Sequence, residues 1–104
     1  METEECTCNI YIPNIFTPNS DGINDNLQVS IQCDFIFEIN NFRVFDRWGN
    51  NVFSSSNAEE INWNGIFENN NVPAGVYSWI LEYSITRNQI KQEFLKSGDI
   101  TVIR

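Results

Sequence analysis

Apolar and polar residues alternate in several short segments of the chain, and this period of two is the pattern of a half-buried β-strand. In the segment 27–32, Leu27, Val29 and Ile31 fall on one face, while the residues between them are polar. The segment 75–86 shows the same alternation over a longer stretch. Its predicted inward residues are Tyr77, Trp79, Leu81, Tyr83 and Ile85. We therefore predict a strand at each segment and a long central strand at the second.

Residues that favour tight turns divide the middle of the chain. The segment 37–53 has apolar stretches on both sides of Trp48-Gly49 and Asn50-Asn51, which predicts an antiparallel hairpin. The segment 61–67 predicts a short strand with an Asn-Gly turn of its own.

The last third of the chain follows the same scheme. The segment 69–75 predicts a polar loop in which Pro73 stops one element and Gly75 opens the next. The segment 88–104 predicts a return strand that is broken at Ser97-Gly98 and then resumes.

The spacing of these segments predicts the fold class. No stretch keeps an apolar period of about 3.6 residues with helix caps, so no helix beyond a turn or two is expected. Short strands with regularly spaced turns favour an all-β fold, an immunoglobulin-like antiparallel β-sandwich of about seven strands. A small barrel has the same periodicity and stays open as the alternative. We expect residues 1–8 to be a linker or lead sequence and residues 9–104 to be one domain.

Composition narrows the classes of partner. Acidic residues outnumber basic ones by 14 to 6, for a formal net charge of −8. Nucleic acid and anionic membranes both need a basic face, so neither is an expected partner. No window approaches the roughly 20 apolar residues of a membrane-spanning helix, and the acidic start does not fit a signal peptide. We expect a cytosolic protein or, in preference, a piece of a larger one.

Residue types that enzymes use are scarce. The chain has no His, which removes the commonest general base and a common zinc ligand. Glycoside hydrolysis requires two carboxylates that face each other across a cleft. A pair such as Asp21 and Asp25 lies on one tight turn and has no such opposing partner. An enzyme is therefore the last-ranked hypothesis, and no catalytic residue is predicted.

The cysteines are Cys6, Cys8 and Cys33, so at most one intrachain bridge can form. A bridge from Cys6 or Cys8 to Cys33 would fit an oxidising or extracellular location. Incidental or buried thiols are the alternative, and the sequence leaves both open.

The stretch "NSDGIND" has the composition of a metal-binding loop or of a turn. Asn19, Asp21, the Ile23 carbonyl and Asp25 supply oxygen at alternating positions around a glycine, which is the spacing of a calcium loop. The alternative is a turn whose side chains bond their own backbone. Calcium is the cofactor that this pattern allows, and the structural turn is the preferred interpretation.

Several stretches resemble, in order and spacing, the gliding-motility-associated C-terminal domain, which is the type B sorting domain of the bacterial type IX secretion system. The resemblance runs from about Ile10 to Arg104 and is carried by "IPNIFTPNSDGINDNL", "FRVFDRWGNNVF", "WNG", "VPAGVYSWILEY" and "GDITVIR". The matching turn residues are Pro18, Asn19, Asp21, Gly22, Asn24, Asp25, Arg47, Trp48, Gly49, Pro73 and Gly75.

The resemblance implies a function that composition does not. Such domains direct large cargo proteins through the type IX outer-membrane translocon to the cell surface of diderm bacteria, by way of the periplasm. The implied partners are the translocon, a dedicated outer-membrane protein and the N-terminal cargo region of the same polypeptide. The resemblance also implies an immunoglobulin-like sandwich, in agreement with the strand pattern.

Recognition by the translocon has two candidate sources in the last hairpin. The basic residues Arg87, Lys91, Lys96 and Arg104 could form a patch, although lysines that keep an edge strand from aggregating are the preferred interpretation. The terminal strand, with Ile100 and Val102, could be read by strand addition or could simply close the sandwich. For Trp48 the default expectation is a ring packed in the core or in its turn.

Three functions from different classes follow. The leading hypothesis is a non-enzymatic sorting module. The second is a calcium-dependent adhesive or carbohydrate-binding sandwich, which predicts exposed aromatic rings beside the acidic loop. The third is the carboxylate-pair enzyme.

Overall fold

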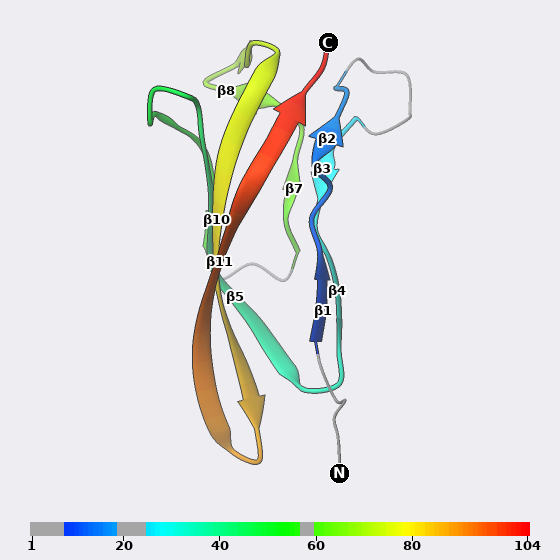
Figure 1. Ribbon diagram of the computed structural model, residues 1–104, viewed down its shortest axis with the longest axis vertical. Coiled ribbons are helices and arrows are strands. Elements are labelled where there is room, and N and C mark those ends of the chain that lie inside the picture. The colour runs from blue at the N-terminus through cyan, green and yellow to red at the C-terminus, as the bar shows by residue number, and fades with distance from the viewer. Residues whose placement is uncertain (1–7, 19–24, 57–59) are drawn as a thin grey trace.

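The larger layer of the fold is a five-stranded sheet (Figure 1). The computed structural model describes residues 8–18, 25–56 and 60–104. The order of strands in the sheet is β2 (Ile15–Phe16), β11 (Ile90–Val102), β10 (Gly75–Arg87), β5 (Ile36–Phe45) and β6 (Asn51–Ser56). Every neighbouring pair is antiparallel except β2 and β11, which run parallel.

Short strands on the other side of the core complete a sandwich. They are β1 (Cys8–Tyr11) with β4 (Ser30–Cys33), and β3 (Leu27–Gln28) with β7 (Asn62–Trp63). A small hairpin of β8 (Ile66–Phe67) and β9 (Asn70–Asn71) follows. The described residues contain no helix, and so none that is long and apolar enough to cross a membrane. The predicted all-β, immunoglobulin-like sandwich is confirmed.

Trp63 lies at the centre of the core between the two layers. Its ring is 1% exposed and lies within 5.5 to 6.2 Å, centroid to centroid, of the rings of Phe16, Phe53 and Tyr77. These rings come from β2, β6 and β10, so one side chain of the smaller layer contacts three strands of the large sheet. The indole Nε1 donates a hydrogen bond to the Ile66 carbonyl at 3.2 Å, which satisfies its one polar atom.

The predicted strands appear with two differences in the first half of the chain. The segment 27–32 divides into β3 and β4 at Val29, whose amide bonds the Ile61 carbonyl instead of a strand neighbour. The segment 69–75 holds β9 as well as a loop, because Glu68 and Asn69 both adopt positive φ and form a two-residue turn. The hairpin over 37–53 is confirmed as β5 and β6.

The predicted central strand is confirmed as β10, which pairs with β5 on one side and β11 on the other. Tyr77, Trp79 and Leu81 are buried as expected. The predicted inward positions of Tyr83 and Ile85 were wrong, because the register of β10 with β5 shifts between Glu82 and Tyr83 and both residues are only half-buried. Ser84, between them, is fully buried, with its hydroxyl 3.4 Å from a carboxylate oxygen of Glu38.

The predicted break at Ser97-Gly98 was wrong, because β11 runs unbroken through both residues. Gly98 is needed here because the position has no room for a side chain. A Cβ at Gly98 would lie 2.7 Å from the nearest ring carbon of Trp79, the residue opposite it on β10. The buried indole therefore packs directly on the backbone of β11, and no larger residue fits beneath it.

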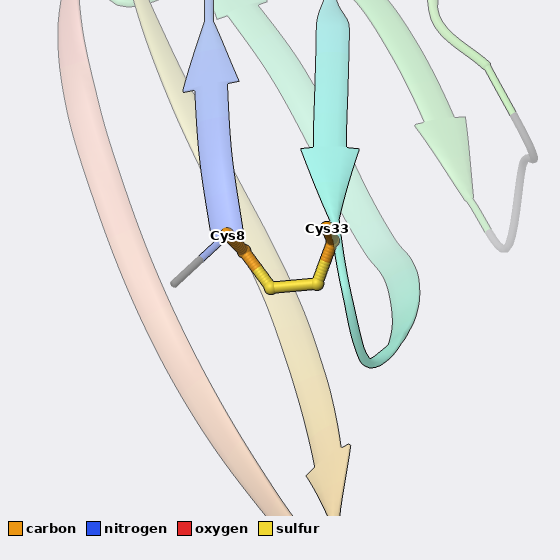
Figure 2. Close-up of a disulfide and its surroundings, with 2 residues drawn as sticks. All are labelled: Cys8 and Cys33. Atoms are coloured by element: carbon orange, nitrogen blue, oxygen red, sulfur yellow. A yellow bond between two sulfur atoms is a disulfide. The ribbon is translucent and has the colours of Figure 1, made fainter. Parts of the chain in front are cut away.

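A disulfide joins the two strands of the β1–β4 pair at their ends (Figure 2). Cys8 and Cys33 are register partners. Of the two bridges that the sequence allowed, Cys6–Cys33 and Cys8–Cys33, the structure contains the second. It closes a stretch with a sequence separation of 25 residues. Strand β1 begins at Cys8, which the sequence assigned to the linker.

Replacing Gly98 by Ala should destabilise the domain. A methyl group cannot fit under the buried Trp79 ring without moving it, and overpacking of this kind costs about 1–3 kcal/mol. The free energy of unfolding in urea, followed by tryptophan fluorescence, measures the effect. Ser97→Ala, at the exposed neighbour, is the matched control and should stay within about 0.5 kcal/mol of the parent chain. Equal stabilities of the two variants would contradict the packing.

Removing the disulfide by Cys8→Ser with Cys33→Ser should lower the free energy of unfolding by about 3 kcal/mol, because the unfolded chain regains the freedom of the closed stretch. Thermal unfolding of oxidised protein would show the loss as a lower Tm. Cys6→Ser is the control that removes a thiol and leaves the bridge. A Cys6→Ser protein that loses as much stability as the double variant would overturn this expectation.

Candidate functional site

Most of the stretches that carry the family resemblance meet at one end of the molecule, near the C-terminus (Figure 1). We call this region the signature end. It consists of Pro18, the β5–β6 turn (46–51), Gly65, the segment 72–77 and Arg104. These segments are far apart in sequence, so their meeting is a property of the fold alone.

Arg104 holds the signature end together. Its guanidinium donates hydrogen bonds to three carbonyl oxygens, those of Val72 at 2.6 Å, Gly65 at 2.7 Å and Pro18 at 3.2 Å. The planar, multiply donating guanidinium suits this arrangement, which a lysine ammonium could not reproduce.

Gly65 is required at its position for two reasons. Its φ of +79° lies in the left-handed region, and a Cβ there would lie 3.0 Å from Pro18 Cγ and 3.1 Å from a guanidinium nitrogen of Arg104. The Asn-Gly signal at 64–65 predicted the turn, but its contact with two distant residues has no sequence signal.

The β5–β6 turn is built around the Asp46 carboxylate. One carboxylate oxygen accepts hydrogen bonds from the amides of Trp48 at 2.9 Å and Asn50 at 2.8 Å, and the other accepts one from the Asn50 side chain at 3.1 Å. Desolvation acts to raise the pKa of Asp46, but the hydrogen bonds from Asn50, Trp48 and Gly49 outweigh it and the pKa lies below 3.8. The turn is therefore fixed by an ionised side chain.

This rigid turn presents Trp48 to solvent. The ring is 79% exposed, so the default expectation of a packed ring was wrong. The reason is local: Asp46 ties the backbone of residues 48–50 into a tight loop, and Gly49 supplies the positive φ of 86°. The side chain between them points away from the core.

A concavity of about 310 Å³ lies beside Trp48. It is lined by Asp46, Arg47, Trp48, Pro73, Ala74, Gly75, Val76 and Tyr77, so two resemblance motifs that are separate in sequence form one surface. Val76 is also exposed there. Arginine and tryptophan are the residue types that most often dominate protein interfaces.

A second groove of about 510 Å³ runs along the other side of the same turn. Its lining is rich in amides and carboxylates, with Phe67 as an exposed ring, and includes Asp46, Asn50, Asn51, Glu68, Asn70 and Asn71. Tyr77 lies between the two concavities and donates its hydroxyl to the Pro73 carbonyl at 2.6 Å. Burial and the Asp46 carboxylate raise the pKa of Tyr77, and Arg104 and Arg47 oppose the rise.

The structure does not bring the predicted basic residues together. Arg87 lies at the far tip of the β10–β11 hairpin over the Phe35 ring, and Lys91 lies 3.4 Å from a carboxylate oxygen of Glu38. Lys96 is exposed on β11, while Arg104 belongs to the opposite end of the molecule.

The terminal strand closes the sandwich. Ile100 and Val102 are at most 1% exposed, and β2 pairs with β11 at Thr101 and Val102. The backbone groups of β11 at this edge are therefore already paired with the segment that contains β2. A strand of another protein could not add to the sheet at residues 100–102.

The candidate calcium loop falls mainly outside the described residues. Asn19, Asp21, Gly22, Ile23 and Asn24 are not described, so their calcium binding stays a prediction. Asp25, the last predicted ligand, is half-buried. Within residues 8–18, 25–56 and 60–104 no three His, Cys, Asp or Glu side chains are grouped as metal ligands would be.

Comparison with known proteins gives one clear result. The family model described as "CHU_C Type IX secretion signal domain" matches residues 10–98, which is most of the chain. This is a family of secretion signals and not of enzymes. No protein of curated function matches the chain.

Replacing Arg104 by Ala should loosen the signature end and lower the free energy of unfolding by about 2 kcal/mol, since hydrogen bonds from charged groups contribute more than neutral ones. Arg104→Lys should lose most of the same stability, because one ammonium cannot serve three separated carbonyls. Urea unfolding measures the total effect. Hydrogen exchange at the Val72 amide, which bonds the Gly65 carbonyl at 2.9 Å, measures it locally.

Arg87→Ala is the matched control, because Arg87 lies at the other end of the same hairpin. In the Arg87→Ala variant, the Val72 amide should undergo hydrogen exchange at the same rate as in the parent chain. If Arg104→Ala leaves both stability and exchange unchanged, the three hydrogen bonds do not hold the signature end.

Proposed function

The chain belongs to the CHU_C type IX secretion signal domain family, and on that premise we propose that it sends the polypeptide attached to it through the outer-membrane translocon. The cargo region lies on its N-terminal side, passes through the periplasm and is delivered to the cell surface or the medium. The domain acts as a folded address and performs no chemistry on its cargo.

We propose that the translocon or a dedicated outer-membrane partner reads the signature end. The observation that carries this proposal is the exposed Trp48 ring beside a concavity formed by two resemblance motifs. A largely exposed tryptophan on a rigid turn loses little freedom on binding and buries a large apolar surface, as interface anchors do. Arg104 supports this proposal, because its hydrogen bonds join Pro18, Gly65 and Val72 at the same end of the molecule.

The Cys8–Cys33 bridge supports passage through an oxidising compartment. Disulfides of this kind persist in the periplasm and outside the cell and are rare in the cytosol. The domain is therefore suited to fold before it crosses the outer membrane.

A carbohydrate-binding module is the second candidate function. The groove lined by Asp46, Glu68 and several asparagines supports it, because carboxylates and amides are suited to sugar hydroxyls and Phe67 offers an exposed ring. Calcium at the loop around Gly22 would belong to this function and can be tested by the Tm with and without the ion.

A secretion assay tests the first proposal. The 104-residue chain is fused behind a fluorescent protein that carries an export signal, and the fusion is expressed in a bacterium with an intact type IX system and in a translocon mutant. We expect fluorescence on the surface or in the medium of the intact strain only. Fluorescence that stays in the periplasm of both strains, with the domain folded, would refute a sufficient signal and favour the carbohydrate-binding module.

Trp48→Ala tests where the signal is read. Surface fluorescence should fall at least about tenfold, in line with loss of an interface anchor. Ile90→Ala is the matched control, since Ile90 is 64% exposed at the opposite end of the molecule and should leave delivery unchanged. Circular dichroism and Tm of the purified variants confirm that both fold. Normal delivery of Trp48→Ala would exclude this anchor and leave the sorting role standing.

A further inference from the structure

The outer edge of β11 is open over most of its length. Its only strand partner on that side, among the residues the structure describes, is β2, and the pairing covers Thr101 and Val102 alone. The amides of Thr101 and Ile103 point to β2, so the odd-numbered residues of β11 direct their N–H and C=O groups outward. From Lys91 to Ser97 the strand is exposed on both faces.

A ladder of stacked aromatic rings ends at this open edge. The rings of Phe37 and Tyr83 are 5.1 Å apart and those of Tyr83 and Phe94 are 5.3 Å apart, centroid to centroid, with interplanar angles of 16° and 21°. These rings belong to β5, β10 and β11 in turn, so the ladder crosses the sheet with the spacing of its strands. Phe94, the outermost ring, is 40% exposed and has no ring beyond it among the described residues.

We propose that this edge pairs with the same edge of a second copy of the chain, antiparallel and centred on Phe94. The two sheets then join into one, and the two aromatic ladders meet at a pair of Phe94 rings. Because Phe94 bonds to β10 and not outward, its pair across the new interface is of the non-hydrogen-bonded kind, in which side chains approach most closely.

The charges along β11 are compatible with this register and disfavour two others. With Phe94 opposite itself, Lys91 faces Ser97, Gln92 faces Lys96 and Glu93 faces Leu95, so no like charges are directly opposed. A pairing centred on Glu93 would oppose two carboxylates, and one centred on Lys96 would oppose two ammonium groups, which is unfavourable in each case.

Occupancy of the edge excludes the remaining neighbouring register. Centred on Leu95, the pairing would bring Gln89 of the second copy opposite Thr101, where Ile15 of β2 already lies. Centred on Phe94, the second β11 begins with its Ile90 opposite Gly98 and stays clear of β2.

Electrostatics makes the association dependent on salt. Each chain carries a net charge of −8, so two copies repel each other at long range. Screening reduces this repulsion, since the Debye length falls from about 10 Å at 0.1 M salt to about 3 Å at 1 M. The dimer should therefore become tighter as salt is added, which distinguishes it from an assembly held by ion pairs.

Sedimentation equilibrium of the whole chain over a range of protein concentrations tests the proposal. Every protein in the test also carries Cys6→Ser, so that no interchain bridge through that thiol can imitate a dimer. We expect a monomer–dimer equilibrium that shifts toward dimer between 0.1 and about 1 M NaCl. A single-chain mass at every concentration and salt level would overturn the proposal.

A proline substitution on the open edge distinguishes dimerisation through this edge from dimerisation through another surface. Glu93→Pro removes an outward N–H that makes no strand bond within the chain, so the fold should survive and the dimer should be lost. Glu93→Gln is the matched control for charge and should dimerise at least as well as the parent. Circular dichroism and Tm verify folding, and a folded Glu93→Pro protein that still dimerises would place the interface elsewhere and refute the proposal.

Cysteine cross-linking tests the register. Opposed cysteines at a non-hydrogen-bonded antiparallel pair lie at about 4.5 Å between Cα atoms, close enough for a disulfide. Phe94→Cys should therefore form an interchain bridge on mild oxidation, while Gln92→Cys should not, because its opposite residue is Lys96. Bridging at residue 92 and not at residue 94 would show that the register is wrong. None of these measurements involves secretion, so they stand apart from the sorting role.

Discussion

The packing of Trp63 between the layers is the contact on which the rest of the structure depends. The smaller layer consists of very short strand pairs, which cannot be stable by their own backbone hydrogen bonds. Trp63 places one large buried ring against Phe16, Phe53 and Tyr77, which belong to three strands of the five-stranded sheet. Two of these strands, β2 and β6, are the edges of that sheet, so the same ring fixes both edges and the layer that covers them.

The signature end follows from this arrangement. Trp63 is followed directly by the turn at Gly65, and its indole bonds the Ile66 carbonyl, so the position of the core ring sets the position of the turn. Arg104 then joins that turn to Pro18 and Val72. Core packing and surface geometry are thus coupled through a few hydrogen bonds, so these loops are held in place by the same residue that centres the core.

The two ends of the β10–β11 hairpin have different properties. At the signature end β11 is paired on both sides and its inward residues are buried. Toward the hairpin tip, β11 is exposed on both faces and its outer edge is open. A secretion signal can therefore present its turns for recognition at one end and hold an aromatic sheet edge available at the other.

The sequence by itself determined the class of fold and its main strands, because alternation of apolar residues reports which face of a strand is buried. It also identified the motif turns at Trp48-Gly49 and Pro73, where backbone chemistry is local. Tertiary structure alone decided that Gly98 lies under Trp79 within an unbroken strand and that Arg104 reaches three carbonyls. These features arise from contacts between residues far apart in the chain, and no local pattern encodes which distant side chain will fill a given space.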